Sequence, residues 1–575
     1  MKAKFILPLL YSIQIGFREI RQSYFWSQQS EKLRCNGLLQ CFSMKLWVKR
    51  TSIITEKLFG LSIFIAIVSC QQKNEYSEAI NSVFNEAGSN KTELIEVLKY
   101  YQKDSKDSLK LQAAEFLIEN MLGHSYNKSK LVDTSKTRVA FNVLDYPDYK
   151  TMVEAWDSIE NRIGTIENVR DTVIYDSKVI TASYLINNID LAFKAWENPW
   201  AAKLSFDKFC EYILPYRGSN EPLEEWRSHF VKKYKWLKDS LNDINDPIEA
   251  AERINSDLKS WFKFDARLYR HPTDLGLAEM EQTKVGRCED MTNLAAYAMR
   301  ANGIPVMTDY VTHWPTTGNN HAWNATYDKN GKVIIFMGAL NNPGEYQLNN
   351  KKAKVYRKTF SIQQNCLSNI KPDYEKVPGW LRSKHYIDVT REYIETADIQ
   401  PKIKIAIPDS INFGYLAVFN SGKWEPTAWG KLDRDKKVVR FNSLGKDIVY
   451  AGVFYKGDSL IYFNQPFLVD KTGDLHYFTP DTVHKVDQNF YGTTQRAIVK
   501  TTDEIREVHF KSGATYQLYY WQNRWKLIGE QTAVKEKPLY FKQIPSKALY
   551  WLKEKGGKKE ERIFSIDSNS EIHFR

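Results

Sequence analysis

Apolar residues recur at helical spacing in the part of the chain that follows residue 75. In Asp107–Leu122 they fall three or four positions apart, and Gly123 stands where such a helix would end. The segments Tyr149–Ile163 and Ser183–Trp196 carry similar stripes. A stripe of this period indicates a helix that buries one face, and glycine commonly follows a helix end. We therefore predict a helical domain over residues 75–254.

The pattern changes after residue 385, where β-branched and aromatic residues alternate with polar ones and Gly- or Asn-containing turns interrupt them. This texture is typical of strands joined by hairpins. Tyr415–Phe419 followed by Trp424 matches Tyr516–Tyr520 followed by Trp525 at an offset of 101 residues. At an offset of 100 the match continues, pairing Phe441, Leu444, Ile448, Val449 and Tyr450 with Phe541, Ile544, Ala548, Leu549 and Tyr550.

The repeat predicts two tandem β-sandwich modules, at residues 385–482 and 483–575, because a duplicated unit preserves its strand pattern. Chance alternation of β-forming residues is the alternative explanation of the match. Residues 351–384 then form a connector between the first module and the segment before it.

A buried helix is predicted directly after Val285–Asp290. Its apolar face comprises Met291, Leu294, Ala295, Ala298 and Met299, and Gly303 ahead of Pro305 marks its end. Cys288 therefore lies in the first turn, where unpaired amides and the helix dipole favour thiolate over thiol. The same amides can stabilise an oxyanion. The alternative role for Cys288 is that it is only a small buried residue of the hydrophobic core.

Two strands follow this helix. Ile304–Thr312 is the first, a polar loop containing His313 comes next, and His321–Tyr327 is the second. If the face of the second strand that carries His321 turns toward the helix, the His321 side chain lies next to Cys288. It can then act as the base for this nucleophile. His313 is predicted to be a loop residue, and a place beside Trp314 in a substrate groove is its alternative role.

These motifs resemble the transglutaminase-like superfamily, whose core has a papain-type arrangement of Cys, His and Asp. The matching residues are Gly286–Asp290, Gly303–Pro305 and His321–Trp323, and the resemblance covers about residues 255–345. It implies a core domain at 255–350 and thiol acyl chemistry through a thioester, with Cys288 as nucleophile and His321 as base. That chemistry includes amide hydrolysis, deamidation and cross-linking.

The flanking regions resemble exported Bacteroidetes lipoproteins that carry this core. The fold class that follows is α+β and multidomain. It comprises a helical N-terminal region, a transglutaminase-like (papain-like) core and C-terminal tandem β-sandwich modules.

The sequence departs from the superfamily pattern at its aspartate. The strand after the hairpin reads Val333–Ala339 and offers no carboxylate where the superfamily places one. Asp328 belongs to the hairpin turn and is poorly placed to substitute. Asn342 and Glu345 follow closely, and either is a candidate third member that orients His321. Losing an orienting group lowers the rate by orders of magnitude without abolishing a site of this kind.

Composition supports a multidomain globular protein. The 575 residues are 43% hydrophobic and 26% charged, and this length exceeds what one hydrophobic core supports. The net charge of +12 contains +4 from residues 1–43 and +3 from residues 44–69, which leaves only +5 for the other 506 residues. We therefore expect no nucleic-acid partner. The sequence also shows no zinc-ligand spacing and no phosphate-binding loop, so we expect neither a metal nor a cofactor.

The N-terminal segment has the form of a secretory signal. A basic stretch begins at Met44, the apolar run 58–68 follows, and Ile67-Val-Ser-Cys70 resembles a bacterial lipobox. The run is too short to span a membrane as a helix. We predict that residues 1–43 are a misassigned extension, that residues 44–69 are a lipoprotein signal peptide, and that Cys70 is lipidated. The mature protein is then an exported bacterial lipoprotein on the outer membrane or periplasmic face, bound to the bilayer through its acyl anchor.

Three cysteines remain in that mature chain beyond Cys70, namely Cys210, Cys288 and Cys366. An odd number leaves at least one thiol free. Upstream of Cys288, the segment Leu204–Arg217 gathers four aromatic residues and Cys210 around Glu211 and Arg217. It indicates either a buried ion pair beside a helix end or a substrate surface.

Two functions fit the sequence. The first is an enzyme in which Cys288 attacks an amide of a peptide, a glycopeptide or a cell-wall peptide and His321 transfers the proton. The second is a catalytically decayed scaffold whose β-sandwich modules bind carbohydrate or a protein partner. In the second, Trp424, Trp521 and Trp525 would form the binding surface, although such residues also occur in sandwich cores.

Overall fold

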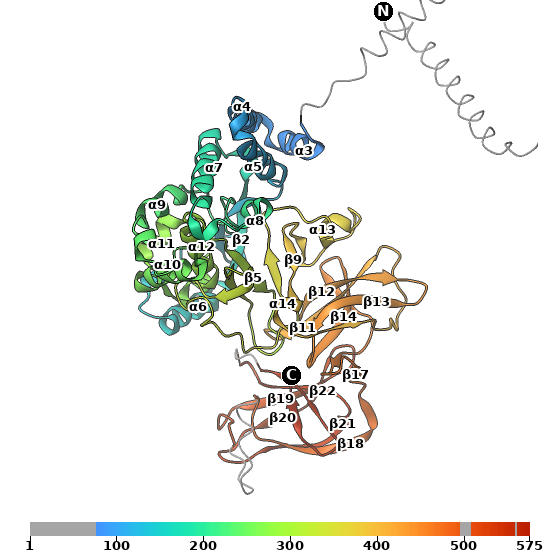
Figure 1. Cartoon of the computed structure of the whole chain (residues 1–575). Helices are drawn as coiled ribbons and strands as arrows, with labels where there is room; N and C mark the ends of the chain where they lie inside the picture. Colours follow the sequence, from blue (N-terminus) through green and yellow to red (C-terminus); the bar gives the residue numbers. More distant parts are fainter. Residues whose placement is uncertain (1–75, 495–507, 558–560) are drawn as a thin grey trace, which may run out of the picture. The chain divides into compact units, whose positions relative to one another are not determined.

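A computed structural model describes residues 76–494, 508–557 and 561–575, with Tyr76–Arg575 as one compact unit (Figure 1). The predicted extension, the signal peptide and the lipidation site Cys70 lie outside the described residues. Among the helices of the described ranges, none has both the length and the apolar composition of a membrane span.

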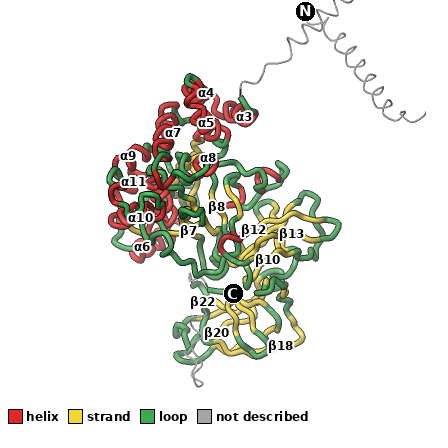
Figure 2. The backbone as a smooth tube through the Cα atoms, in the orientation of Figure 1, coloured by secondary structure: helices red, strands yellow, loops and turns green. Residues whose placement is uncertain are grey.

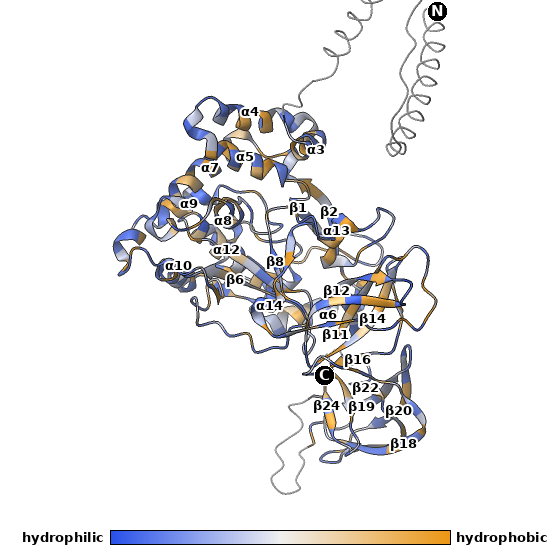
Figure 3. Ribbon diagram, turned by 45° about the vertical axis from the view of Figure 1, so that its right-hand side comes forward, coloured by the Kyte–Doolittle hydropathy of each residue, from blue (hydrophilic) through white to orange (hydrophobic). Residues whose placement is uncertain are grey.

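The helices nearest the N-terminus pack around a hydrophobic cluster of their own, which includes Leu94, Leu117 and Leu185. They are α3 (Glu78–Ala87), α4 (Lys91–Gln102), α5 (Ser108–Glu119), α7 (Ala182–Trp196) and α8 (Phe206–Tyr212). Hydrophobic and hydrophilic residues alternate along α4 and α5 (Figure 3), as expected for helices that bury one face. The stripes predicted in this region therefore mark real helices.

The helical region also contains two strands between α5 and α7, which the sequence analysis did not predict. There β1 (Ser125–Val132) and β2 (Glu167–Tyr175) pair antiparallel, on either side of the predicted helix α6 (Tyr149–Ile163). Apart from Leu131 and Val132, both strands lie at least partly at the surface. Strands with so little burial carry only a weak hydrophobic alternation, which explains why the sequence did not reveal them.

A second group of helices packs around the central helix α12 (Cys288–Arg300), and its hydrophobic cluster includes Leu258, Leu294 and Trp323. The group comprises α9 (Trp226–Lys233), α10 (Pro247–Trp261) and α11 (Leu277–Thr283). A five-stranded antiparallel sheet in the order β7-β6-β5-β8-β9 adjoins α12. Its strands are β5 (Met307–Val311), β6 (His321–Tyr327), β7 (Val333–Phe336), β8 (Tyr356–Lys358) and β9 (Tyr386–Asp388). Strand β9 falls within the range predicted for the first β module.

The end of α12 depends on Gly303. Its φ is +79°, and a Cβ at this position would collide with the carbonyl oxygen of Ala195 on α7. Gly331 in the β6–β7 turn has a similar φ of +81°, but nothing lies within 4 Å of the position of its Cβ. Substitution of the two glycines therefore distinguishes the cost of backbone strain from the cost of a packing clash.

We expect Gly303→Ala to lower the free energy of unfolding by about 3 kcal/mol, since it combines left-handed strain with a backbone clash. Gly331→Ala should cost only about 1 kcal/mol, because strain acts there alone. Urea denaturation of both variants measures the difference. Equal losses would show that the contact with Ala195 relaxes at little cost.

The C-terminal region consists of antiparallel strands (Figure 2). The first set is β10 (Thr396–Ile399), β11 (Phe413–Asn420), β12 (Lys423–Asp433), β13 (Val438–Gly445), β14 (Ile448–Lys456), β15 (Ser459–Tyr462), β16 (Phe467–Val469) and β17 (Leu475–Tyr477). The second set is β18 (Asp481–Phe490), β19 (Thr515–Trp521), β20 (Trp525–Thr532), β21 (Leu539–Ser546), β22 (Leu549–Glu554), β23 (Ile563–Ile566) and β24 (Ile572–Phe574).

The two sets share five strand pairings, and the first set has two more, β12 with β13 and β14 with β15. In the first, β10 pairs with β13, β11 with β12 and β14, and β16 with β14 and β17. In the second, β18 pairs with β21, β19 with β20 and β22, and β23 with β22 and β24. Shared strand order and these shared pairings support the duplication that the sequence repeat predicted.

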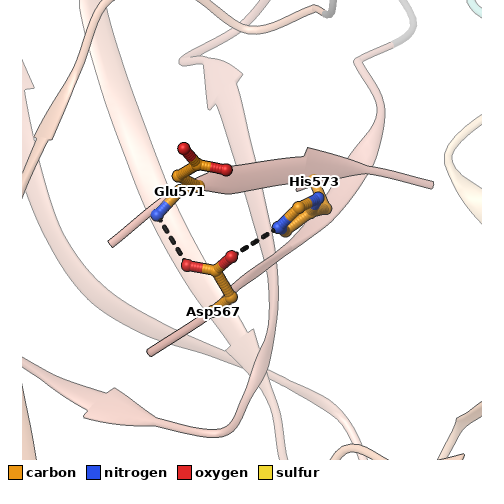
Figure 4. A group of neighbouring side chains, drawn as sticks. All are labelled: Asp567, Glu571 and His573. Atoms are coloured by element: carbon orange, nitrogen blue, oxygen red, sulfur yellow. Dashed lines mark hydrogen bonds and ion pairs between the residues drawn. The ribbon is translucent and has the colours of Figure 1, made fainter. Parts of the chain in front are cut away.

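The last hairpin of each set carries the same polar motif. Asp470 accepts hydrogen bonds from the Asp474 amide and from His476 Nε2 at 2.9 and 2.6 Å. Ninety-seven residues later, Asp567 accepts them from the Glu571 amide and from His573 Nε2, both at 2.9 Å (Figure 4). The repeat therefore extends to the end of the chain, beyond the positions that the sequence comparison aligned.

Candidate functional site

Cys288 is the first residue of α12, as predicted. Asp290 fixes this helix start, because its carboxylate accepts a hydrogen bond from the Arg287 amide at 2.9 Å. Arg287 in turn forms an ion pair with Asp274. The thiol is buried, with 7% of the residue exposed. The helix start thus holds the sulfur in a fixed and largely enclosed position.

The pKa of the Cys288 thiol is raised, opposite to the shift expected for a helix start. Burial is the main cause, and the neighbouring carboxylate of Glu289 adds to it. A hydrogen bond from the backbone of Ala322 and the charge of Arg287 act in the other direction without reversing the shift. Desolvation of the charged form outweighs the interactions that favour the thiolate here, so the resting site holds a neutral thiol at pH 7.

His321 is the first residue of β6 and lies among three aromatic rings. Its ring centroid is 6.2 Å from that of Trp314, 5.9 Å from that of Trp323 and 6.2 Å from that of Tyr346. Its Nε2 atom forms a 2.6 Å hydrogen bond with the Tyr346 hydroxyl. Burial lowers the pKa of His321 to about 4, so the imidazole is neutral at pH 7.

Cys288 and His321 share one enclosure. The thiol is hydrogen bonded to the backbone of Ala322, the residue after His321. Trp314, Trp323 and Tyr346, the rings around the imidazole, belong to the same hydrophobic cluster as Cys288. The structure therefore brings the two predicted residues into one neighbourhood, where the thiol and the imidazole are both neutral at pH 7.

Asn342 and Glu345 do not take the predicted place beside His321. The Asn342 side-chain oxygen accepts a hydrogen bond from Asn255 on α10 at 3.2 Å. Glu345 caps its own turn, because its carboxylate accepts from the Asn342 amide at 3.0 Å. Asn255 also accepts from the Ala339 amide and so holds this turn to α10. Within the part of the chain that the structure describes, Tyr346 is the hydrogen-bond partner of the His321 ring.

A buried carboxylate does lie near this site, but it positions Trp323 through Tyr393 and forms no hydrogen bond with His321. Asp309 on β5 is paired across the sheet with Trp323. It binds the Arg357 guanidinium through two hydrogen bonds of 2.8 Å and accepts a third from Tyr393 at 2.5 Å. Tyr393 accepts the indole N–H of Trp323 at 2.9 Å. This network fixes the aromatic wall of the site.

Two tyrosines complete the site, and the sequence analysis missed both. Tyr346 holds His321, and Tyr269 forms a hydrogen bond with Cys288 that contributes, after burial, to raising the pKa of Tyr269 to about 12. Tyr269 is 43% exposed, whereas Cys288 is 7% exposed. Both lie outside the predicted helices and strands, where hydrophobic periodicity carries no information.

His313 lies in the loop before β6, as predicted. Its Nε2 atom is 3.9 Å from the carboxylate of Glu425 on β12, and burial lowers its pKa to about 4. Glu211 and Arg217 do not pair with each other. Arg217 binds Asp176 at 2.5 Å, and Glu211 accepts hydrogen bonds from the amides of Phe360 and Ser361.

Among the described residues, one group of side chains is close enough to share a metal ion. Asp567, Glu571 and His573 offer ligand atoms within 4.8 Å of one another (Figure 4). Asp567 already organises the hairpin turn, and both carboxylate residues are exposed. The group lies at the hairpin of β23 and β24, in the second set of C-terminal strands.

Residues 235–336 match the transglutaminase-like superfamily, so the chain carries a domain of this superfamily there. The matched range contains both Cys288 and His321. With α3–α5 before it and the antiparallel sheets after it, the fold class predicted from the sequence is confirmed. No curated protein matches the chain.

Two solved structures show faint similarity. A protein of Cytophaga hutchinsonii described as "a Putative Cysteine Protease" is 13% identical with a TM-score of 0.16, over 28% of this chain and 58% of that one. Red sea bream transglutaminase is 9% identical with a TM-score of 0.20, over 78% of each chain. The chain thus spans less than two thirds of the first protein, and scores this low carry no argument about function.

Proposed function

We propose that this protein is a thiol acyl-transfer enzyme that hydrolyses amide bonds of peptides, glycopeptides or cell-wall peptides. The observation that carries the proposal is that a buried Cys288 thiol, hydrogen bonded to the backbone of Ala322, and a neutral His321 lie among the same aromatic residues. A superfamily domain at residues 235–336 supports the same chemistry. The carboxylate that usually orients the histidine is replaced by the Tyr346 phenol.

The reaction proceeds in two steps. In the first, the Cys288 proton passes to His321 while the sulfur attacks the amide carbonyl, and amides at the start of α12 stabilise the oxyanion. The C–N bond then breaks, and the amine leaves with the proton from His321. In the second step, His321 takes a proton from water while the water oxygen attacks the thioester carbonyl. The C–S bond then breaks, the acid leaves, and His321 returns its proton to the Cys288 sulfur.

Hydrolysis is favoured over cross-linking because water is the abundant nucleophile for a protein exposed at the cell envelope. The lipobox-like sequence ending at Cys70 supports export and an acyl anchor in the bilayer. An anchored enzyme would have cell-wall peptides within reach. This placement belongs to the proposal, as does the choice of substrate.

The decayed scaffold with a carbohydrate-binding surface has less support. Trp424 and Trp521 are 4% and 3% exposed, and their ring centroids lie 5.6 Å apart in an edge-to-face contact. Trp525 packs against Phe419 and Trp521. These rings pack with one another and present little surface for a sugar.

A peptide thioester tests the proposal directly. Incubated with the protein, it should acylate Cys288, and the intact mass should rise by the acyl group and then return as free acid appears. Adding a primary amine at millimolar concentration should leave the acid as the main product. If the acyl group never appears on Cys288, the proposed enzymatic mechanism is wrong. If the main product is instead an amide of the added amine, the protein is a transferase that uses amines as acceptors.

A further inference from the structure

The loop between β5 and β6, residues 312–320, is bound by a side chain of the first β module. The side-chain nitrogen of Asn420, the last residue of β11, donates to the carbonyls of Trp314, Thr317 and Asn319 at 2.9, 3.0 and 2.9 Å. An asparagine amide has two N–H groups, so the three carbonyls share them. Asn420 itself is only 2% exposed. The conformation of this loop therefore depends on a buried residue that lies 106 positions beyond Trp314.

Two further contacts attach the same loop to the β modules. At its start, the Thr312 hydroxyl forms a 2.7 Å hydrogen bond with the hydroxyl of Thr427 on β12, and both residues are buried. Arg562, in the second module, donates to the Pro315 carbonyl, and through the same nitrogen to the Phe419 carbonyl at 3.1 Å. Both modules thus contribute to holding the loop.

Asn420 occupies a position at which the two modules differ. At the offset of 101 residues that aligns Tyr415–Phe419 with Tyr516–Tyr520, Asn420 corresponds to Trp521. Trp521 is 3% exposed and packs edge to face against Trp424. The same strand end therefore accepts a large aromatic side chain in the second module. The module fold alone does not call for an amide at this position, whereas the loop carbonyls do.

The loop places Trp314 against the base of the site. The Trp314 ring centroid lies 6.2 Å from that of His321, with the ring planes 28° apart, and Trp314 is 5% exposed. The Trp314 amide donates to the Asn319 carbonyl at 3.1 Å and closes the loop on itself. Because Asn420 binds the carbonyls of both residues, the position of the indole beside the imidazole depends on Asn420.

Trp314 affects His321 by keeping water away from its ring. Burial is the cause that lowers the pKa of His321 to about 4 from its ordinary value of 6.5. If Trp314 moved away, water could solvate the imidazolium, and the pKa would rise toward 6.5. The protonation of His321 therefore reports the position of Trp314.

Charged neighbours do not account for this shift, since burial alone lowers the pKa of His321. Glu289 is paired with Lys358 and Asp309 with Arg357, at 2.7 and 2.8 Å. The titratable groups on the elements around the ring are Cys288 and Glu289 on α12, Asp309 on β5, His313 in the loop, and Tyr346. Burial raises the pKa of Cys288 and of Tyr346 and lowers that of His313 to about 4, so these three are neutral at pH 7.

We propose that Asn420 is a positioning residue of the active site and that the β modules belong to the catalytic unit. Asn420 holds the loop 312–320 so that Trp314 covers His321. As a claim about catalysis, this rests on the proposed function. As a claim about how the imidazole is kept from water, it is independent of turnover.

The test is an NMR titration of the full chain with isotope-labelled histidine, in which His321→Ala identifies the His321 signal. In the wild-type protein the midpoint should lie near pH 4. In Asn420→Ala and in Trp314→Ala it should rise by at least about one pH unit, because the ring becomes solvated. In Asn420→Ala, kcat/KM should then begin to fall at the same higher pH on the acid side.

Asn464→Ala is the matched control. Asn464 is 6% exposed, and its side-chain amide donates to the Lys402 carbonyl at 3.2 Å within the same module. Its loss should leave the midpoint near pH 4, whatever it does to the melting temperature. The double variant Asn420→Ala/Trp314→Ala should show no larger shift than Trp314→Ala, since Asn420 acts through Trp314.

An unchanged midpoint in Asn420→Ala or Trp314→Ala, an equal shift in Asn464→Ala, or additive shifts in the double variant would overturn the proposal. If Asn420→Ala does not fold, Thr427→Val takes its place under the same criteria, because it removes another anchor of the loop with a side chain of the same shape. The expected shifts in a protein that cleaves no amide would refute only the proposed function. Amide cleavage with an unchanged midpoint would refute only this inference.

Discussion

Cys288→Ala is expected to lower amide hydrolysis by about 10⁴-fold or more, because the thioester of the proposed mechanism forms on the Cys288 sulfur. Substitution of this small buried side chain should cost only about 1 kcal/mol of stability. Loss of activity with an almost unchanged melting temperature would therefore identify the sulfur as chemically required. Steady-state hydrolysis of a peptide substrate and a thermal melt measure the two effects.

Cys210 and Cys366 provide matched controls, since both are free and buried. Burial is the main cause that raises the pKa of Cys210 to about 12, and this thiol lies in the cluster of the N-terminal helices. Cys366 packs with the residues that join the central sheet to the first β module. Cys210→Ala and Cys366→Ala should retain activity within a few fold. If Cys288→Ala retained it as well, the scaffold interpretation would replace the enzyme.

The central part of this molecule was predictable because its signals are local. The face formed by Met291, Leu294 and Ala298 fixes α12, and the sequence placed Cys288 at its start and His321 at the start of β6. The repeat in the C-terminal region was visible for the same reason, since paired strands preserve their alternation.

What could not be predicted arises from contacts between distant segments. Tyr346 reaches His321 from an irregular segment, and the place expected for Asn342 was lost because Asn255 on α10 holds it. The sign of the Cys288 pKa shift depends on how deeply the helix start is buried, which helical position alone does not specify. Burial and long-range hydrogen bonds depend on the tertiary structure, and they account for each of these differences from the prediction.

His321→Ala is expected to lower the rate near pH 7 by about 10³-fold or more. The raised pKa of Cys288 leaves almost no thiolate at this pH, so the site depends on its base for a nucleophile. In the variant the rate should rise about tenfold per pH unit toward the pKa of the thiol, because hydroxide then removes the proton. The pH dependence of kcat/KM separates this loss of a base from a loss of fold.

In the wild-type protein, kcat/KM should start to fall on the acid side near pH 4 rather than near pH 6.5. His321 is neutral above its lowered pKa of about 4 and loses its function as a base only when pH falls through that value. A free enzyme with a thiolate and an imidazolium at rest would instead show a limb set by the ionisation of the thiol. A limb near pH 6.5 would contradict the buried neutral pair.

Tyr346→Phe tests how the imidazole is oriented. The tautomer that fits the proposed base has its proton on Nε2, donated to the Tyr346 oxygen, and its lone pair on Nδ1 for the Cys288 thiol. A phenol stabilises the imidazolium less than a carboxylate does, which fits the low pKa of His321. Removing the hydroxyl should therefore lower kcat about tenfold, far less than His321→Ala. A loss as large as that of His321→Ala would instead make Tyr346 a participant in proton transfer.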